Sequence, residues 1–409
     1  MRRLARGLCA LTLSLTLAHG TRAWGQPRGV PAAPLDERPS VAVGSIHACA
    51  LDRQGAVWCW GQSEGYALGD GTLATRLRPA VVPGLEGGVV QLGVGYAFGC
   101  ALRDTGELWC WGDAGRARVP GADPALRGRA FPVTSLGRDV VLVRVDGTHV
   151  IALLRDGSLR IMGPENLSLT YRSDLPPGMP LVDVTLGTFN ACALRADGVL
   201  SCWGDSTWGG LGPGPEIDPT DQSFDRNHHA VVVARDAAGR PLPVRSLASA
   251  GAARCALLED RSVWCWGSNG HNHLGRGDYA VRSDENPAPV VGLPPDLERL
   301  ESGDAGICAI TTGGDAWCWG RNDFGQMGNG DLTPFEGRLP GSDRLHYLGT
   351  TPRPLRLGGA RVASVSSTSD RLCAWYGSDR VRCYGLPFGM RYRRMTRVPP
   401  PSNYVFPTR

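Results

Sequence analysis

The stretch HACALDRQGAVWCWG (His47–Gly61) determines the fold of this chain, because it predicts a short β-hairpin with one cysteine on each strand. Alternation with a period of two places Cys49 and Cys59 on the same face of the hairpin. The polar residues between the strands, ending in a glycine, are typical of a tight turn. With this turn midway between them, the two cysteines lie directly opposite each other. Opposed residues on paired strands have Cβ atoms about 4.5–5.5 Å apart, so slight closing of the hairpin allows a disulfide.

The hairpin pattern occurs seven times along the chain, and six copies keep two cysteines ten residues apart. The pairs are Cys49 with Cys59, Cys100 with Cys110, Cys192 with Cys202, Cys255 with Cys265, Cys308 with Cys318 and Cys373 with Cys383. The third copy has Ile151 and Ile161 at these positions, so both cysteines are lost together, as pairing predicts. We therefore expect each cysteine pair to form a disulfide within its own hairpin. Pairs of buried free thiols are one alternative. A metal site is another, although the repeats lack the C-x-x-C spacing of zinc sites.

Each hairpin is followed by a glycine-rich segment, such as WGRNDFGQMGNGD (Trp319–Asp331), then by a proline-bearing apolar strand and a further apolar strand. Seven repeats with about four strands each predict an all-β chain, folded as a seven-bladed β-propeller with four-stranded blades and intrablade disulfides. We expect the strand near Arg393–Val398 to pair with the N-terminal end and close the ring. The tryptophans before the second cysteine are expected to pack between blades; they are Trp58, Trp109, Trp264 and Trp317.

The N-terminus has the pattern of a secretory signal peptide, with basic residues followed by an apolar run and small residues. The run from Leu8 to Ala18 is too short to span a bilayer, which takes about 20 residues. No other stretch reaches that length. The predicted organisation is a signal peptide at 1–23, a flexible linker at 24–37, the propeller at 38–399 and a C-terminal tail at 400–409.

Removal of the signal peptide changes the cysteine count and the charge. Cys9 leaves with the peptide, so thirteen cysteines become twelve, an even number that suits an oxidising compartment. Cleavage after Ala23 also removes four arginines and reduces the net charge from +4 to zero. A neutral body argues against binding to nucleic acid. We expect a secreted or periplasmic monomer.

The composition excludes several kinds of chemistry. All 43 basic residues are arginine, which excludes a Schiff-base lysine and a phosphate-loop lysine. The chain has no G-x-S-x-G elbow and no H-E-x-x-H motif. We predict no catalytic residue, no metal and no cofactor. Four histidines in loops offer a possible metal site, but surface loop residues are the simpler interpretation; they are His228, His229, His271 and His273.

The turns that precede the cysteine hairpins are the candidate binding face, because they are expected to surround one mouth of the propeller. The candidate residues are Ser45, Ile46, Tyr96, Ala97, Thr148, Thr188, Phe189, Asp304 and Asp370. Tyr96 and Phe189 are aromatic, a type enriched in binding hot spots. The alternative is that these are varied turn residues without a partner. His47 and His149 share one repeat position, which suggests a structural hydrogen bond near the end of the blade.

The repeat itself resembles a known family. The pattern G-x-x-H-x-C-A-L, followed by D-x-x-G-x-V-x-C-W-G and a glycine-rich segment, resembles the regulator of chromosome condensation repeat, best at Gly44–Gly61 and Gly303–Gly330. The third and seventh copies depart from it, with Met162 and Tyr384 in place of tryptophan. The resemblance extends over residues 38–399 and implies a seven-bladed propeller. The cysteine pairs and the signal peptide are similar to those of the secreted bacterial branch.

The function predicted from these features is a non-catalytic extracytoplasmic binding protein that presents a propeller face to a protein partner. An envelope glycan is a second possible partner. One alternative is an extracytoplasmic hydrolase or lyase with its site in the central mouth, built from residues such as Asp304, Asp370 and His149. The family name also implies guanine-nucleotide exchange on a small GTPase, which a secreted location argues against.

Overall fold

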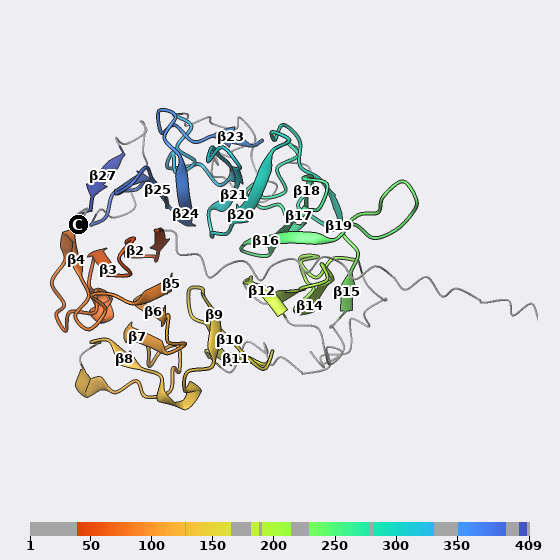
Figure 1. The fold of residues 1–409 in the computed structure, drawn as a ribbon. Coiled ribbons are helices and arrows are strands. Elements are labelled where there is room, and N and C mark those ends of the chain that lie inside the picture. The colour runs from red at the N-terminus through yellow and green to blue at the C-terminus, as the bar shows by residue number, and fades with distance from the viewer. Residues whose placement is uncertain are drawn as a thin grey trace, which may run out of the picture.

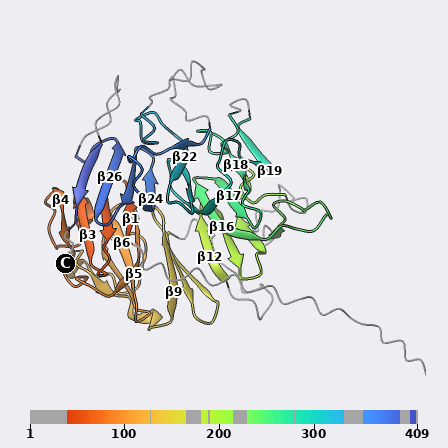
Figure 2. The same cartoon turned by 45° about the horizontal axis from the view of Figure 1, so that its top comes forward.

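The computed structural model describes residues 39–126, 128–164, 181–187, 190–213, 229–277, 281–330, 351–389 and 401–406. In these ranges the chain forms seven sheets arranged in a ring, as Figure 1 shows. Each sheet consists of strands that are consecutive in the chain, so each sheet is one blade of a propeller. Figure 2 shows the blades standing side by side around the ring. The all-β seven-bladed propeller predicted from the repeats is confirmed.

The blades follow one another in chain order, and in each the first strand lies nearest the axis. Blade 1 contains β1 (Ser40–Val43), β2 (His47–Leu51), β3 (Val57–Gly61) and β4 (Arg76–Val81). Blade 2 contains β5 (Val89–Val94), β6 (Phe98–Arg103), β7 (Leu108–Gly112) and β8 (Phe131–Pro132). Blade 3 contains β9 (Val140–Val145), β10 (Val150–Leu154) and β11 (Leu159–Met162). Blade 4 contains β12 (Leu181–Leu186), β13 (Asn190–Arg195), β14 (Leu200–Gly204) and β15 (His229–Val231).

The last three blades continue the pattern. Blade 5 contains β16 (Val244–Ala250), β17 (Ala253–Leu258), β18 (Val263–Ser268) and β19 (Ser283–Pro289). Blade 6 contains β20 (Leu297–Glu301), β21 (Gly306–Thr311), β22 (Ala316–Gly320) and β23 (Arg353–Pro354). Blade 7 contains β24 (Val362–Thr368), β25 (Arg371–Tyr376), β26 (Arg380–Gly385) and β27 (Ser402–Val405). Short 3-10 turns lie at Glu64–Tyr66, Pro124–Leu126 and Thr134–Leu136.

At the end of blade 3 the predicted fourth strand falls on residues outside the described ranges, and at the end of blade 7 the boundary differs from the sequence prediction. Blade 3 has three described strands, and residues 165–180, which follow β11, lie outside the described residues. Blade 7 is completed by β27, which pairs with β26. The propeller therefore extends past residue 399, into the segment 400–409 that the sequence predicts as a tail. The expected strand near Arg393–Val398 lies outside the described residues.

The ring closes by packing between the first and last blades. The expected pairing of a strand near residues 393–398 with the N-terminal end involves residues outside the described ranges and stays a prediction; among the described strands, β1 and β27 each pair within their own sheets. Side chains of β24 bond to the backbone of β1. The N–H groups of Val41 and Val43 donate to the hydroxyls of Ser364 and Ser366 at 2.9 and 3.1 Å, respectively. Both inner strands are thereby held together along their length.

The cysteine hairpins have the predicted register. Cys49 pairs directly with Cys59, and their Cα atoms lie 4.1 Å apart across a disulfide. The other five hairpins have the same register and Cα–Cα distances of 4.0–4.1 Å. Their disulfides join Cys100 to Cys110, Cys192 to Cys202, Cys255 to Cys265, Cys308 to Cys318 and Cys373 to Cys383. All twelve bonded cysteines are buried, so the disulfides belong to the core of each blade.

The blade without cysteines keeps the same hairpin geometry. Ile151 of β10 pairs directly with Ile161 of β11, in the register that the cysteines have in the other blades. Ile151 is fully buried, so an apolar pair takes the place of the disulfide in the core of blade 3.

The interfaces between blades are centred on the tryptophan that follows the second cysteine. Trp60, Trp111, Trp266 and Trp319 are fully buried. Trp111 packs into a cluster from blade 1, and Trp319 packs into a cluster from blade 5. The tryptophans predicted for this role lie half-buried, and three of them pack at the edges of the same clusters; these three are Trp58, Trp109 and Trp264.

The glycine-rich loops provide an acceptor and space for these tryptophans. Trp111 Nε1 donates to the Ala67 carbonyl of the preceding blade at 3.0 Å, and Trp319 Nε1 donates to the His273 carbonyl at 2.8 Å. Gly69 has φ of 71°, and a Cβ atom there would lie 2.8 Å from the Trp111 ring. Both the conformation and the contact therefore require glycine. The loop is a packing element between blades.

Candidate binding site at one mouth of the propeller

The turns between the first and second strands of the blades meet around the axis at one end of the ring. They share this end because every blade begins with its innermost strand and continues through this turn into the cysteine hairpin. Tyr96 N–H donates to the Gly147 carbonyl of the next blade at 2.8 Å, and Asp304 N–H donates to the Ser367 carbonyl at 3.1 Å. We call these turns the turn ring. Its described members are residues 44–46, 95–97, 146–148, 187, 251–252, 303–305 and 369–370.

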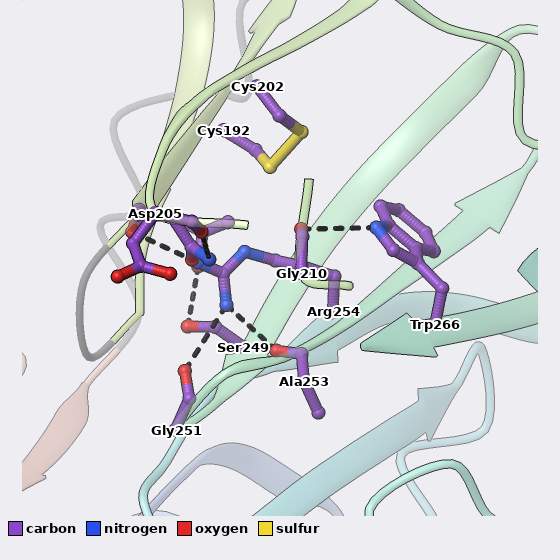
Figure 3. Close-up of a disulfide and its surroundings, with 11 residues drawn as sticks. Cys192, Cys202, Asp205, Gly210, Ser249, Gly251, Ala253, Arg254 and Trp266 are labelled. Atoms are coloured by element: carbon purple, nitrogen blue, oxygen red, sulfur yellow. Dashed lines mark hydrogen bonds between the residues drawn. A yellow bond between two sulfur atoms is a disulfide. The ribbon is translucent and has the colours of Figure 1, made fainter. Parts of the chain in front are cut away.

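A buried arginine fixes the turn ring between blades 4 and 5. Arg254 of β17 is completely buried and lies between Gly251, Ala253 and the strands of blade 4 (Figure 3). Its guanidinium donates to the backbone carbonyls of Ala253 and Asn190 at 2.8 and 3.0 Å and to the Asn190 side chain. Burial lowers the pKa of Arg254 to about 9, and the charge of Asp146 opposes that effect. The group therefore remains charged at neutral pH, with backbone carbonyls as its main partners.

A second buried arginine joins the last blade to the first. Arg371 donates to the Ser45 carbonyl at 2.8 Å and to the Leu386 carbonyl at 3.0 Å. Its guanidinium lies 4.5 Å from the centre of the Phe388 ring and 3.3 Å from the Asp370 carboxylate. The turn ring is therefore held by buried arginines between blades 4 and 5 and between blades 7 and 1, and by backbone hydrogen bonds at other junctions.

The candidate residues differ in their access to solvent. Tyr96 has 55% of its surface exposed and Asp304 is also exposed. Five others are half-buried; they are Ser45, Ile46, Ala97, Thr148 and Asp370. Thr188 and Phe189 lie outside the described residues. The Tyr96 ring covers Gly147, where a Cβ atom would lie 3.0 Å from the ring. Tyr96 is therefore a fixed aromatic group that rests on the neighbouring blade.

The turn ring also carries a third carboxylate, Asp146, which the sequence reasoning did not select. Its oxygen accepts the N–H groups of Thr148 and His149 at 3.1 and 2.9 Å. Asp146 belongs to blade 3 and Asp304 to blade 6, yet the two carboxylates interact electrostatically. Carboxylates from opposite sides of the ring therefore share one mouth. The sequence feature that could have identified Asp146 is its position directly before Gly147, at the start of the turn.

Asp304 has an unusual carboxyl group. Its side chain is exposed at the opening, but no described residue donates a hydrogen bond to it or pairs with it. Although the residue is exposed, the surrounding protein of the mouth partly desolvates its carboxyl group; this desolvation raises the pKa of Asp304 to about 6, and the Asp146 charge adds to the effect. Between about pH 4 and 6, the folded state therefore binds more protons than the unfolded state, and ionisation of Asp304 lowers stability as the pH rises.

Asp304→Asn is expected to stabilise the protein at pH 8 and to have little effect at pH 4.5. The amide removes the charge that burial disfavours, and solvent screening limits the gain to at most about 1 kcal/mol. Guanidinium unfolding of wild type and variant at both pH values checks this. Equal differences in midpoint at the two pH values would contradict a raised pKa at Asp304, since all other groups cancel in the comparison.

The residues considered for an enzyme site do not form one constellation. Asp304, Asp370 and His149 belong to blades 6, 7 and 3, and no hydrogen bond or ion pair joins them. His149 is 3% exposed, and its Nδ1 lies 3.1 Å from the Thr148 hydroxyl. The expected structural hydrogen bond is thus present at His149. His47 is fully buried, and neither of its ring nitrogens has a hydrogen-bond partner among the described residues.

The described part of the chain contains no group of three or more metal-ligating side chains. His271 and His273 lie with their ring centres 5.6 Å apart. His228 and the side chain of His229 lie outside the described residues. In the same described ranges, no helix is long and apolar enough to cross a membrane.

Comparison with known sequences relates the chain to one repeat family. The Regulator of chromosome condensation (RCC1) repeat matches residues 40–65, 89–116 and 300–326, and a second form of it matches 54–102. E3 ubiquitin-protein ligase HERC2 of Homo sapiens is 24% identical over 379 residues, which cover 89% of this chain and 6% of that protein. RCC1 domain-containing protein RUG3, mitochondrial, of Arabidopsis thaliana is 26% identical over 71% of this chain and 67% of that protein. The chain thus corresponds to a small part of HERC2.

Solved structures share the fold. The crystal structure of Kap60 bound to yeast RCC1 (Prp20) contains a chain with a TM-score of 0.65 and 18% identity, covering 82% of this chain and 80% of that one. Human WBSCR16 has a TM-score of 0.64 and 20% identity, covering 83% of this chain and 86% of that one. At these identities the likeness shows the propeller fold and nothing about partners.

Proposed function

We propose that this chain, in which residues 40–116 and 300–326 match the Regulator of chromosome condensation (RCC1) repeat, is an extracytoplasmic, non-catalytic binding protein that presents the turn ring to a protein partner. The observation that carries this proposal is Tyr96. Among the described members of the turn ring, Tyr96 is the large aromatic side chain that is exposed, at 55%, and its ring packs against Gly147 of the next blade. Rigid aromatic groups on a scaffold contribute large contact area at low entropic cost, which is why they dominate many interfaces.

The charge of the turn ring indicates the kind of surface it accepts. Asp146 and Asp304 share the mouth, and Asp370 is the third carboxylate of the ring. Arg371 offsets part of the charge of Asp370, while Asp304 has no cationic partner among the described residues. A protein partner with a basic protrusion therefore complements this mouth better than an acidic one does.

The proposed location rests on the disulfides. Disulfides persist in oxidising compartments and are rare in the cytosol. Six of them are found here, one in each blade except the third. The basic and apolar pattern of residues 1–23 supports export. Yeast RCC1 (Prp20), which shares the fold, has been crystallised with Kap60, so a propeller of this kind is able to take a protein partner.

Site-specific crosslinking tests the proposal. A photoreactive phenylalanine analogue at position 96 is expected to capture one protein from native envelope extract and culture medium. The same analogue at position 208 is the control, because Trp208 is an aromatic residue, 47% exposed, that lies in a loop outside the turn ring. Tyr96→Ala is then expected to weaken binding of the purified partner at least about tenfold, as truncation of a hot-spot aromatic does.

The results separate the proposal from its alternatives. Capture at position 208 and not at 96 would contradict the turn ring as the binding face. Retention of an envelope glycan in place of a protein would contradict the partner class. Hydrolysis by the mature protein that Asp304→Ala abolishes without unfolding would establish an enzyme. Nucleotide exchange on a small GTPase would support the activity implied by the family name.

A further inference from the structure

The opposite mouth of the propeller contains an open cavity of about 780 Å³. It is lined by the beginnings of inner strands and by hairpin turns, which lie at the end of each blade away from the turn ring. Pro39 precedes β1, Arg245 lies in β16, and Ala363 lies in β24. Arg53 and Arg261 come from the turns of the cysteine hairpins of blades 1 and 5. Four consecutive blades, 5, 6, 7 and 1, thus share one cavity.

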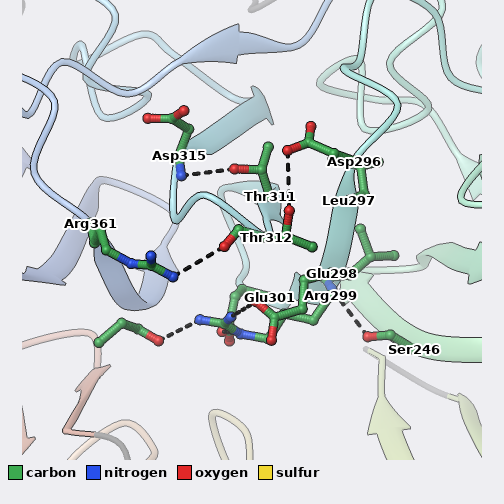
Figure 4. A network of polar contacts seen from close by, with 12 residues as sticks. Ser246, Asp296, Leu297, Glu298, Arg299, Glu301, Thr311, Thr312, Asp315 and Arg361 are labelled. Atoms are coloured by element: carbon green, nitrogen blue, oxygen red, sulfur yellow. Dashed lines mark hydrogen bonds and ion pairs between the residues drawn. The ribbon is translucent and has the colours of Figure 1, made fainter.

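The lining of this cavity is strongly basic. Four arginines contribute to it: Arg53, Arg245, Arg261 and Arg361. One carboxylate, Glu298, also lines it, and that carboxylate lies 3.4 Å from the guanidinium of Arg299. Arg299 in turn pairs with Glu301 at 2.9 Å, as part of the network in Figure 4. Glu298 and Glu301 are therefore directed to Arg299, and Asp296 accepts a hydrogen bond from the hydroxyl of the lining residue Thr312 at 3.3 Å. The four lining arginines have no carboxylate partner among the described residues.

The donors of these arginines are largely unused. The side chains of Arg53 and Arg245 make no hydrogen bond or ion pair with any described residue. Arg361 donates to the Thr312 carbonyl at 3.1 Å (Figure 4), and Arg261 donates to the Leu297 carbonyl. These carbonyl contacts orient two guanidinium groups without neutralising them. Each guanidinium has five N–H donors in a planar fork, so several donors from each remain available to a ligand.

We infer that this cavity is a binding site for a small ligand that carries clustered phosphate or sulfate groups. Its volume lies within the range of small-molecule sites, roughly 300–1,000 Å³. Arginine forks bind such oxyanions through paired hydrogen bonds. One cation would attract any anion weakly, but four around a single cavity select for an anion with several charged groups. The inference concerns the mouth opposite the turn ring and does not depend on the proposed protein partner.

Calorimetric titration of the mature, oxidised protein tests the inference, with inorganic tripolyphosphate and sucrose octasulfate as probes. We expect one of them to bind with one-to-one stoichiometry at about 50 mM salt, and binding to weaken as the salt concentration rises. Comparing the two probes separates phosphate from sulfate as the preferred group. Citrate is expected to bind more weakly, because its carboxylates carry less charge.

Arg53→Gln combined with Arg245→Gln is expected to lower the affinity at least about tenfold, because it removes two of the four charges. Neither side chain has a partner to lose among the described residues, so folding should be preserved. The matched control is Arg78→Gln with Arg235→Gln, which removes the same charge from exposed arginines away from the cavity. Equal losses in both double variants, or no binding of either probe by wild type, would overturn the inference.

Discussion

Reduction of the six disulfides is expected to unfold this protein at neutral pH. Each bridge closes a loop of about ten residues, for which the chain-entropy model gives about 2–3 kcal/mol of stabilisation. Six independent bridges therefore contribute on the order of 15 kcal/mol, as much as the whole stability of a typical domain, about 5–15 kcal/mol. Guanidinium unfolding of the oxidised protein, and of protein refolded after reduction and alkylation, measures the difference.

The chain itself provides the control for this experiment. In blade 3, Ile151 and Ile161 occupy the positions of a cysteine pair and keep its register. The double variant Cys100→Ile with Cys110→Ile introduces the same isoleucine pair into blade 2. It is expected to cost about 2–3 kcal/mol, because it removes the cross-link and retains an apolar pair. If alkylated protein unfolds at the same guanidinium concentration as oxidised protein, the disulfides do not stabilise the fold.

The register of the hairpins was predictable because it is a local property. Two cysteines ten residues apart, with a turn midway, can pair across a hairpin in one way, and the structure pairs Cys49 with Cys59 accordingly. Which tryptophan lies at the blade interface was not predictable on the same grounds. By alternation, Trp58 and Trp60 point to the same face of the hairpin. They differ in their distance from the loop of the preceding blade, which the sequence does not show. Trp60 and its counterparts in other blades are fully buried and lie at the centre of the interfaces; these counterparts are Trp111, Trp266 and Trp319.

The residues at the two mouths of the propeller could also be predicted from the sequence only in part. The turn ring was located from the repeat, because each repeat contributes one turn at the same position. Asp146 was missed since the sequence shows neither its bonds to the next turn residues nor its effect on Asp304. The basic cavity carries no repeat signal at all. Arg53, Arg245 and their neighbours come from distant repeats at different positions, and only closure of the ring brings them together.

The protein is also expected to lose stability at acidic pH. His47 and His273 are buried, and burial lowers the pKa of each to about 3 from 6.5, with the charge of Arg371 adding at His47 and that of His271 adding at His273. Between pH 6.5 and 3 the unfolded state binds these protons and the folded state does not, so stability falls as the pH falls through this window. At pH 4.5 the cost is about 2–3 kcal/mol for each histidine, or about 5 kcal/mol together.

Equivalent positions in other repeats indicate substitutions that remove the two titrating histidines and keep the side chains buried. Phe98 occupies the position of His47 in blade 2, and Gln326 occupies the position of His273 in the loop of blade 6; both are buried. His47→Phe with His273→Gln is therefore expected to match wild type at pH 7.5 and to exceed its free energy of unfolding at pH 4.5. Asp304 acts in the opposite direction over part of this window, but it is common to both proteins and cancels. A double variant that loses stability with falling pH as steeply as wild type would show that these two histidines take up protons in the folded state.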